Sequence, residues 1–293
     1  MNIIMFILNL LKPKNWLIIL SIVLNVGICA GIAVYVSYLF GYNNYLLVSI
    51  CVIAAYIALE LFMLTPVGEA IMRRKMKMKP MPETHWTYAV FNEVKRRTRI
   101  KNRWLSKRLK LYYTESKEMN AYALGSRTVC ITSALTYLKP DYIEGILAHE
   151  FGHITYYDSY VSLLARHGNM LFYAVVMAVW ALCSLFALFL DVIASSVCRD
   201  TRLFRLMVMH FANLLISVVS LISSLLFCAR SRIAEYGADA FAVKIDEGEN
   251  LRDGLITITG GSSPRSRNLT DMLMNTHPAT EKRVKRINKL IAA

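Results

Sequence analysis

Two histidines four residues apart, with a glutamate directly after the first, lie in the segment ILAHEFGHITYYD at residues 146–158. In a helix His149 and His153 lie one turn apart on one face, so both imidazoles can reach a single cation. Glu150 lies about 100° around that helix and can take a proton from a water at the cation without binding the cation. The pattern predicts zinc-dependent hydrolysis, and the alternative is a surface helix with a histidine–glutamate ion pair.

Local signals predict the helix that must hold these side chains. Asp141 is expected to cap its start, with Glu144 three residues on as the reciprocal partner of a capping box. Apolar residues then recur at helical spacing, at Ile143, Ile146, Leu147, Phe151 and Ile154.

A third ligand has to come from a distant part of the chain. Tyr156 and Ser159 occupy the positions of the glycine and the third histidine in the extended pattern H-E-x-x-H-x-x-G-x-x-H. The first glutamate after this helix is Glu235, in SRIAEYGADAFAV. This segment also has helical spacing, so Glu235 can complete the site while Asp239, one turn on, hydrogen-bonds a ligand histidine from behind. The alternative for Glu235 is an ordinary exposed helix acid.

Small side chains on the second segment would let the two helices approach closely. They are Gly237, Ala238, Ala240 and Ala242.

The composition indicates a membrane protein. Of the 293 residues, 56% are apolar and the mean hydropathy is positive, which is too apolar for a soluble protein. No Asp, Glu, Lys or Arg occurs at residues 15–59, where two spans of about 20 residues each fit, at 16–40 and 45–64. Further uncharged runs at 167–190 and 206–229 bring the expected number of transmembrane or membrane-inserted helices to about four.

Basic residues set the expected orientation of these spans. Residues 73–110 contain 14 Lys or Arg against two glutamates, and therefore carry +12 of the chain's net +14. A basic segment beside a span stays in the cytoplasm, and Lys12 and Lys14 before the first span agree with this orientation. We therefore expect an uncleaved anchor and a body that faces the cytoplasm.

The last two apolar runs leave an alternative open. Their connection carries three arginines that disfavour its export: Arg199, Arg202 and Arg205. The two alternatives are that these runs cross the membrane twice and that they form a hairpin that crosses only in part. An even number of crossings returns the chain to the side that it left. The polar blocks 65–166 and 230–293 can then form one catalytic domain, with membrane segments at 1–64 and 167–229.

Two other functional classes are weakened by the composition. The basic segment could bind nucleic acid, but beside a span it is more typical of a topology signal or a contact with anionic lipid. The six cysteines show no C-x-x-C spacing, so neither a disulfide framework nor a cysteine zinc site is supported.

Five stretches, in this order along the chain, resemble the HtpX-like integral-membrane zinc metallopeptidases, relatives of the CAAX prenyl protease. They are NAYALG at 120–125, TVCITSAL at 128–135, GILAHEFGHI at 145–154, SRIAEYGAD at 231–239 and THPATEKRVKRI at 276–287. The resemblance implies a mainly α membrane protein with a zincin-like α+β catalytic domain that contains a small sheet.

The resemblance also assigns roles to single residues. It implies that His149, His153 and Glu235 bind Zn²⁺ and that Glu150 is the general base. Asp239 and Asp158 match acidic positions that support the ligands. Ala234 departs from the family, where arginine usually precedes the ligand glutamate, and this puts a local ion pair in doubt.

Substrate contacts are expected at a strand. The β-branched segment TVCITSAL is typical of a strand, and the resemblance implies that it is the sheet edge to which an extended substrate adds as a further strand. The residues assigned to substrate binding are Asn120, Thr128, Val129, Cys130 and Ile131. The alternative is an interior strand. His277 is either the electrophile that polarises the peptide carbonyl or a helix-start residue that packs under the site.

The sequence therefore predicts a membrane-embedded zinc endopeptidase, multi-pass in the cell membrane, with its catalytic domain facing the cytoplasm. The resemblance implies polypeptide substrates, chiefly unfolded membrane proteins in quality control. Two alternatives are a processing protease of the CAAX type, for which four spans are too few, and a non-catalytic membrane adaptor, against which the intact Glu150 argues. No nucleic-acid partner is expected, and the oligomeric state is left open.

Overall fold

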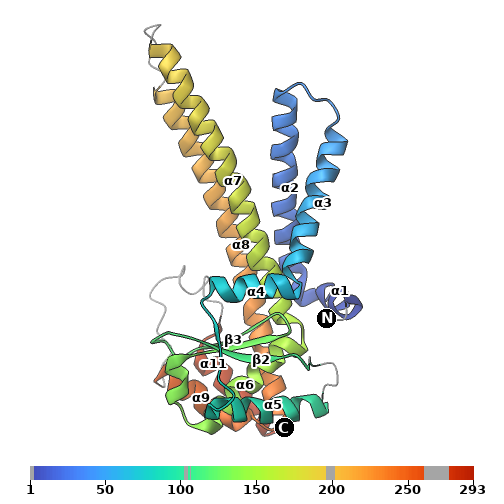
Figure 1. The fold of residues 1–293 in the computed structure, drawn as a ribbon, viewed down its shortest axis with the longest axis vertical. Coiled ribbons are helices and arrows are strands. Elements are labelled where there is room, and N and C mark those ends of the chain that lie inside the picture. Colours follow the sequence, from blue (N-terminus) through green and yellow to red (C-terminus); the bar gives the residue numbers. More distant parts are fainter. Residues whose placement is uncertain (1–2, 102–104, 106, 196–201, 261–276) are drawn as a thin grey trace. The chain divides into compact units, whose positions relative to one another are not determined.

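The computed structural model describes residues 3–101, 105, 107–195, 202–260 and 277–293. The chain divides into two compact units (Figure 1). Unit 1 comprises Met1–Ile19, Leu61–Leu164 and Phe227–Ala293, and unit 2 comprises Leu20–Glu60 and Ala165–Leu226. Residues 196–201, which include Arg199, lie outside the described residues.

Four long helices have residues in unit 2 and also in unit 1. They are α2 (Trp16–Leu39), α3 (Tyr45–Met63), α7 (Asp158–Ser195) and α8 (Arg202–Lys244). Within the described part of the chain, three stretches are long and apolar enough to cross a membrane: Pro13–Leu39, Tyr45–Met63 and Ser217–Lys244. The predicted run at 167–190 contains a shorter apolar helical stretch, Phe172–Leu182. Glu60, an acid in an apolar helix, lies 3.1 Å from the His167 imidazole, as intramembrane charges usually have a partner.

Unit 1 contains a four-stranded mixed sheet. Its strands are β1 (Lys79–Pro80), β2 (Lys110–Thr114), β3 (Ala121–Leu124) and β4 (Thr128–Thr132), in the spatial order β1-β2-β4-β3. Strand β4 pairs in parallel with β2 and antiparallel with β3, and all five of its residues are buried. The expectation that TVCITSAL forms a sheet edge is therefore wrong, because this apolar segment is an interior strand. In the described sheet, β1 and β3 are the two edge strands.

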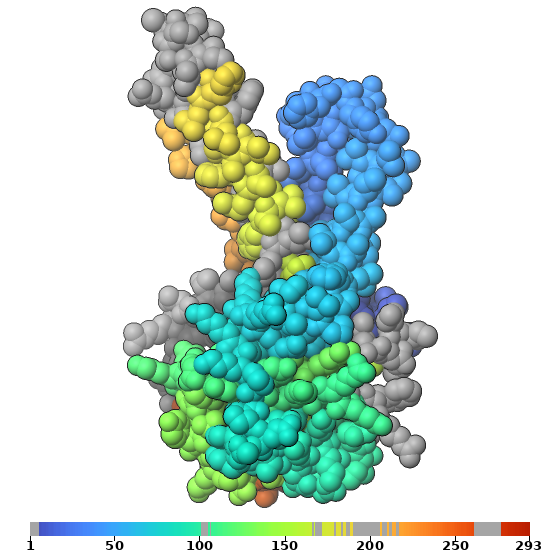
Figure 2. Space-filling view, in the orientation of Figure 1, coloured from blue at the N-terminus to red at the C-terminus, as the bar shows by residue number. Residues whose placement is uncertain are grey.

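Unit 1 contains several further helices. They are α1 (Ile3–Leu10), η1 (Pro13–Asn15), α4 (Pro66–Lys75), α5 (Trp86–Lys101), η2 (Ser133–Tyr137), α6 (Pro140–Thr155), α9 (Gly248–Thr259) and α11 (Thr280–Ile291). The core joins side chains from α5, β2, β4, α6, α9 and α11 with the end of α8, and Phe91, Phe151 and Ile287 are completely buried in it. In the space-filling view, α4 and α5 form much of the visible face of this unit (Figure 2).

Helix α6 begins differently from the prediction. Pro140 occupies its first turn after an extended Lys139, and no side chain caps the helix. The predicted capping box of Asp141 and Glu144 is therefore wrong, because the fixed φ of proline already starts the helix without a side-chain cap. Instead, Glu144 pairs with Arg97 of α5 at 3.2 Å.

Close packing brings α6 against α8. A Cβ atom added to Gly152 would lie 2.9 Å from the Cα of Ala238, a distance that real Cβ atoms do not show. Ala238 and Ala242 are fully buried, and the contact between Gly152 and Ala238 confirms the predicted close approach at Ala238. Gly237 has a more open surrounding, with the Tyr156 ring 3.9 Å from an added Cβ. This contact places the last turn of α6 beside Glu235.

Candidate metal centre

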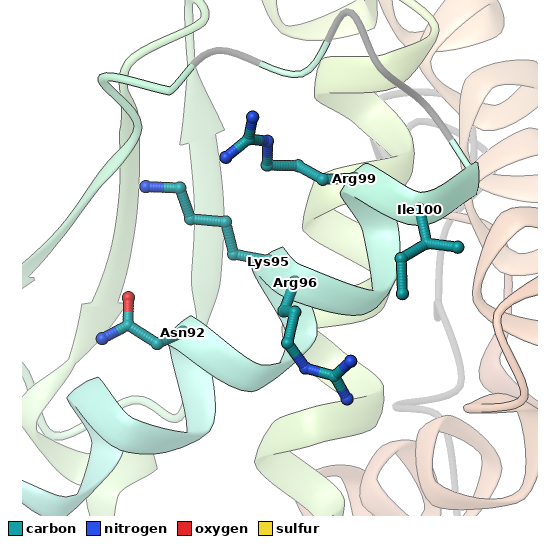
Figure 3. A pocket seen from close by; sticks show the side chains of 5 residues that line it. All are labelled: Asn92, Lys95, Arg96, Arg99 and Ile100. Carbon is teal, nitrogen blue, oxygen red and sulfur yellow. The ribbon is translucent and has the colours of Figure 1, made fainter.

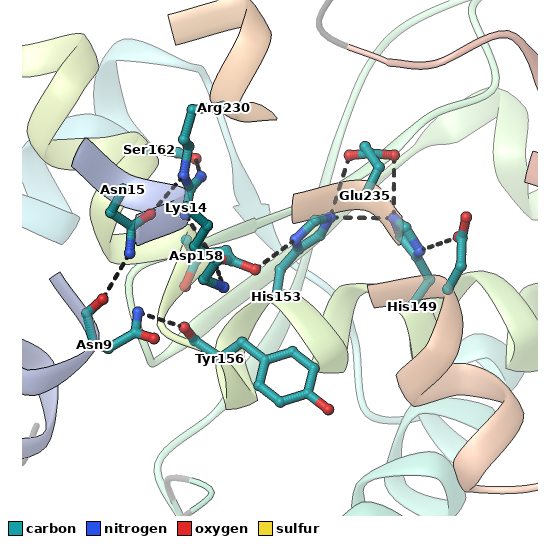
Figure 4. A network of polar contacts seen from close by, with 12 residues as sticks. Asn9, Lys14, Asn15, His149, His153, Tyr156, Asp158, Ser162, Arg230 and Glu235 are labelled. Atoms are coloured by element: carbon teal, nitrogen blue, oxygen red, sulfur yellow. Dashed lines mark hydrogen bonds and ion pairs between the residues drawn. The ribbon is translucent and has the colours of Figure 1, made fainter. Parts of the chain in front are cut away.

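Two helices bring the three candidate ligands together. His149 and His153 come from α6 and Glu235 from α8, and one donor atom of each lies within 4.8 Å of the others (Figure 4). The Nε2 atoms of the two histidines are 3.1 Å apart. The Glu235 carboxylate lies 3.5 Å from His149 Nε2 and 3.3 Å from His153 Nε2. All three donors therefore point at one small volume.

The donor set fits zinc. Ligand atoms at about 2.0–2.1 Å from a tetrahedral zinc lie about 3.3 Å from one another. The observed separations of 3.1, 3.3 and 3.5 Å scatter around this value. Two imidazole nitrogens and one carboxylate oxygen also leave the fourth position free for chemistry, as in catalytic zinc sites. The geometry thus agrees with the predicted ligand set.

Both histidines have a carboxylate on their other ring nitrogen. His149 Nδ1 lies 2.9 Å from Asp239, one turn after Glu235 on α8. His153 Nδ1 lies 3.8 Å from Asp158, the first residue of α7. Such outer partners fix the tautomer and the orientation of a metal-binding imidazole. Asp239 and Asp158 thus lie where the sequence analysis placed them.

The buried Arg283 of α11 contacts both the candidate ligand Glu235 and Asp239. Arg283 donates to both oxygens of Asp239, at 2.6 and 3.0 Å, and its Nη1 lies 3.0 Å from Glu235. This fork geometry gives the strongest kind of charge-assisted pair. Arg283 was not predicted from the sequence, and it stands among four other basic residues of α11. Its one distinguishing signal is the four-residue spacing to the buried Ile287, which puts it on the buried face of the helix.

A second buried arginine holds Asp158. Arg230 of α8 donates to Asp158 at 2.5 Å, and Lys14 from the start of the chain lies 2.8 Å from the same carboxylate oxygen (Figure 4). Asn15 accepts a hydrogen bond from Arg230 Nε at 2.9 Å. Arg230 lies one turn before Ala234 on the same helix. Arg230 was not predicted from the sequence as part of the site.

Burial and charge shift the pKa values of the site in opposite directions. Burial disfavours the imidazolium form of His153, but Asp158 and Glu235 outweigh it and raise the pKa of His153 to about 10. For His149, burial and the charge of Arg283 oppose protonation, yet hydrogen bonds to Asp239 and Glu235 raise its pKa. Burial alone would raise the pKa of Asp158, but His153 and the charges of Arg230 and Lys14 lower it. The metal-free site therefore retains protons that a cation must displace.

Glu150 and His277 complete the predicted catalytic set. Glu150 is buried and follows His149 on α6, so it lies on the adjacent face of the helix. His277 precedes α11, and its Nδ1 lies 2.9 Å from Glu235 while 60% of its side chain is exposed. This places the imidazole against the ligand carboxylate and leaves its other edge open to solvent.

The predicted substrate residues fall into two groups. Thr128, Val129, Cys130 and Ile131 are buried in β4 between two other strands, so they do not form a free edge. Burial also raises the pKa of the Cys130 thiol to about 11. Asn120 precedes β3; its backbone N–H donates to the Thr132 hydroxyl at 2.9 Å, and its carbonyl accepts from the Thr132 N–H at 2.9 Å. A strand can be added to the described sheet beside the metal centre at β3, which packs against α6.

The basic segment forms a separate feature on α5. A hollow of about 600 Å³ is lined by Asn92, Lys95, Arg96, Arg99 and Ile100 (Figure 3). Lys95 donates to the carbonyls of Lys107 and Leu109, and Arg96 pairs with Glu93. These contacts are typical of a solvated helix face, and none of the lining residues belongs to the metal centre.

Comparison with known proteins places the chain in a family. A model described as Peptidase family M48 matches residues 81–291, which contain all three candidate ligands. The chain is 26% identical over 208 residues to "Protease HtpX homolog" of Tropheryma whipplei (strain Twist), a match that covers 61% of this chain and 66% of that protein. It is 26% identical over 235 residues to "Protease HtpX homolog" of Aquifex aeolicus (strain VF5), covering 72% and 73%. The chain thus spans about two thirds of the length of these relatives.

A solved structure has a similar fold. "Crystal Structure of S. mikatae Ste24p" superposes with a TM-score of 0.52 at 18% identity, covering 89% of this chain and 62% of that one. At this identity the likeness shows the fold alone, and it confirms the predicted mainly α membrane fold with a small sheet. The predicted resemblance to HtpX-like proteins is confirmed by the family match and the two relatives. The chain belongs to peptidase family M48.

Proposed function

We propose that this chain is a membrane-embedded, zinc-dependent endopeptidase. The observation that carries the proposal is the convergence of His149, His153 and Glu235 on one volume, with Glu150 on the neighbouring face of the same helix. Membership of a peptidase family and the names of the curated relatives support the same activity. When bound, zinc supplies a Lewis acid that polarises the scissile carbonyl and acidifies a water.

The residues of the chain would then move one proton. Glu150 takes the proton from the attacking water and passes it to the nitrogen of the leaving amine, acting first as base and then as acid. Asp239 and Asp158 keep the two imidazoles in the tautomer that presents Nε2. His277 lies on the Glu235 carboxylate, which favours a role in orienting this ligand over polarising the substrate carbonyl.

Extended polypeptides are the substrates that we propose. The edge strand β3 packs against α6, and an added strand there would be held by backbone hydrogen bonds that read no particular side chain. This supports unfolded membrane proteins as substrates, and hence a role in quality control. The substrate edge is thereby moved from β4 to β3.

For the location, we propose the cell membrane with the metal centre in the cytoplasm. The net charge of +12 at residues 73–110, directly after the second span, supports this orientation. Reporter fusions after Ala293 test it: activity of a cytoplasmic reporter is expected, and activity only of an exported reporter would overturn the orientation.

Casein hydrolysis by the purified chain tests the activity. The wild type with zinc is expected to cleave casein, and Glu150→Gln is expected to abolish cleavage while zinc still binds, because the base is not a ligand. Glu144→Gln is the matched control, since this acid of the same helix pairs with Arg97 away from the ligands. Equal cleavage by wild type and Glu150→Gln would refute the mechanism and would favour a non-catalytic adaptor.

A further inference from the structure

The first residues of the chain contact the end of the helix that carries both histidine ligands. Residues 3–15, here called the N-terminal segment, comprise α1 and η1. The Asn9 side-chain amide donates to the carbonyl of Tyr156, the residue directly after α6, at 2.8 Å. The ring of Phe6 packs on Tyr157 and Tyr160, with centroids 6.4 and 5.8 Å away. Segments about 150 positions apart in sequence thus meet at the junction between α6 and α7.

This junction has an unusual backbone. Tyr157 has a φ of 60°, in the left-handed region that bulky residues rarely adopt. Such a conformation persists only where the surroundings hold it. The turn at Tyr157 sets the start of α7, and with it Asp158, which lies 3.8 Å from His153 Nδ1. The N-terminal segment therefore holds the strained residue on which the position of Asp158 depends.

The same segment also neutralises Asp158. Lys14 Nζ lies 2.8 Å from its carboxylate, and Asn15 accepts from Arg230, the other cation on Asp158. Asn15 in turn donates to the carbonyl of Asn9 at 2.7 Å. Asp158, Arg230 and Asn15 are each at most 1% exposed. Buried charges of this kind need every partner, so loss of one shifts the carboxylate that holds His153.

We propose that the N-terminal segment is a positioning clamp for the metal centre, in which Lys14 acts through Asp158 on the ligand His153. The proposal rests on the proposed zinc peptidase function. Because α2 follows directly at Trp16, the clamp makes the membrane anchor part of the structure that holds the metal. Lys14 is a positioning residue and touches neither metal nor substrate.

The experiment compares three variants of the full chain in detergent. Lys14→Met removes the positive charge that pairs with Asp158, and Lys14→Arg keeps a positive charge at this position. Lys12→Met also removes one positive charge, but from an exposed position two residues earlier. Zinc affinity is measured by competition with a chromophoric chelator, and kcat and KM by hydrolysis of a quenched fluorescent casein. Thermal unfolding of the metal-free chain is recorded for each variant.

We expect Lys14→Met to weaken zinc affinity about tenfold, at the low end of the range for supports of metal ligands. At subsaturating zinc its kcat should fall while KM stays unchanged, and Lys14→Arg should recover most of both losses. Lys12→Met should match the wild type.

Equal zinc affinity in Lys14→Met and Lys12→Met would overturn the clamp, and so would a loss of thermal stability in Lys14→Met with unchanged zinc affinity. Failure of the proposed function has a different signature. If the wild type binds no zinc, or if Glu150→Gln cleaves as well as the wild type, the peptidase assignment falls whatever Lys14 does.

Discussion

The two ligand histidines are supported by groups that resemble each other in composition and differ in geometry. On the side of His149, Asp239 lies 2.9 Å from the ring and is gripped through both oxygens by Arg283. On the side of His153, Asp158 lies 3.8 Å from the ring, and one of its oxygens is shared by Arg230 and Lys14.

The contacts behind the two histidines differ in the elements that provide them. The His149 support combines Asp239 of α8 with Arg283 of α11, and it also reaches the candidate ligand Glu235 through Arg283. The His153 support is looser and depends on residues from the start of the chain. A short bidentate pair fixes a carboxylate more firmly than two single contacts. We therefore expect the first group to dominate the stability of the centre and the second to adjust it.

Arg283→Met should have the largest effect. It leaves Asp239 and Glu235 buried without their cation, and breaking a buried pair of this kind costs about 3–5 kcal/mol in the free energy of unfolding. Arg230→Met should cost less, because Lys14 still pairs with Asp158. Denaturant unfolding of the metal-free chain in detergent measures both. Arg286→Met is the control, since this exposed residue of α11 stacks on Tyr236. A larger loss for Arg230→Met would reverse the proposed order.

Replacing Asp239 and Asp158 one at a time compares the two supports by their effect on zinc affinity. Asp239→Asn should weaken zinc affinity towards the upper end of the about 10–100-fold range for such partners, and Asp158→Asn towards its lower end. The reason is the shorter contact of Asp239 with its imidazole. Competition with a chelator gives both dissociation constants. Equal losses would mean that the distance of 3.8 Å at Asp158 closes when zinc binds.

The sequence predicted the parts of the site that follow from local spacing. His149, Glu150 and His153 lie within one helix, and the scarcity of glutamates singled out Glu235. The clamping cations were not predictable in this way, because Lys14 and Arg230 reach Asp158 across 144 and 72 positions. The order of the strands in the sheet could not be predicted from the sequence either, because a β-branched segment such as residues 128–132 fits an edge or an interior position equally well.

The pH dependence of zinc binding should report the protons that the two histidines hold in the metal-free chain. The raised pKa of His153, about 10, stabilises the metal-free fold below the ordinary histidine pKa, and this contribution is lost as the pH rises through about 10. Zinc must displace that proton, so apparent affinity should rise about tenfold per pH unit between pH 7 and 9 for each proton released.

The charge of Arg283 opposes the imidazolium form of His149, whereas hydrogen bonds to Asp239 and Glu235 raise its pKa. Calorimetric titration with zinc in two buffers of different ionisation enthalpy counts the protons released. Asp158→Asn should reduce that count at pH 8, since it removes a carboxylate that raises the His153 pKa. If the wild type released no proton at pH 7, both imidazoles would already be neutral. The carboxylates behind them would then orient the rings without holding protons, and the two supports would differ in geometry alone.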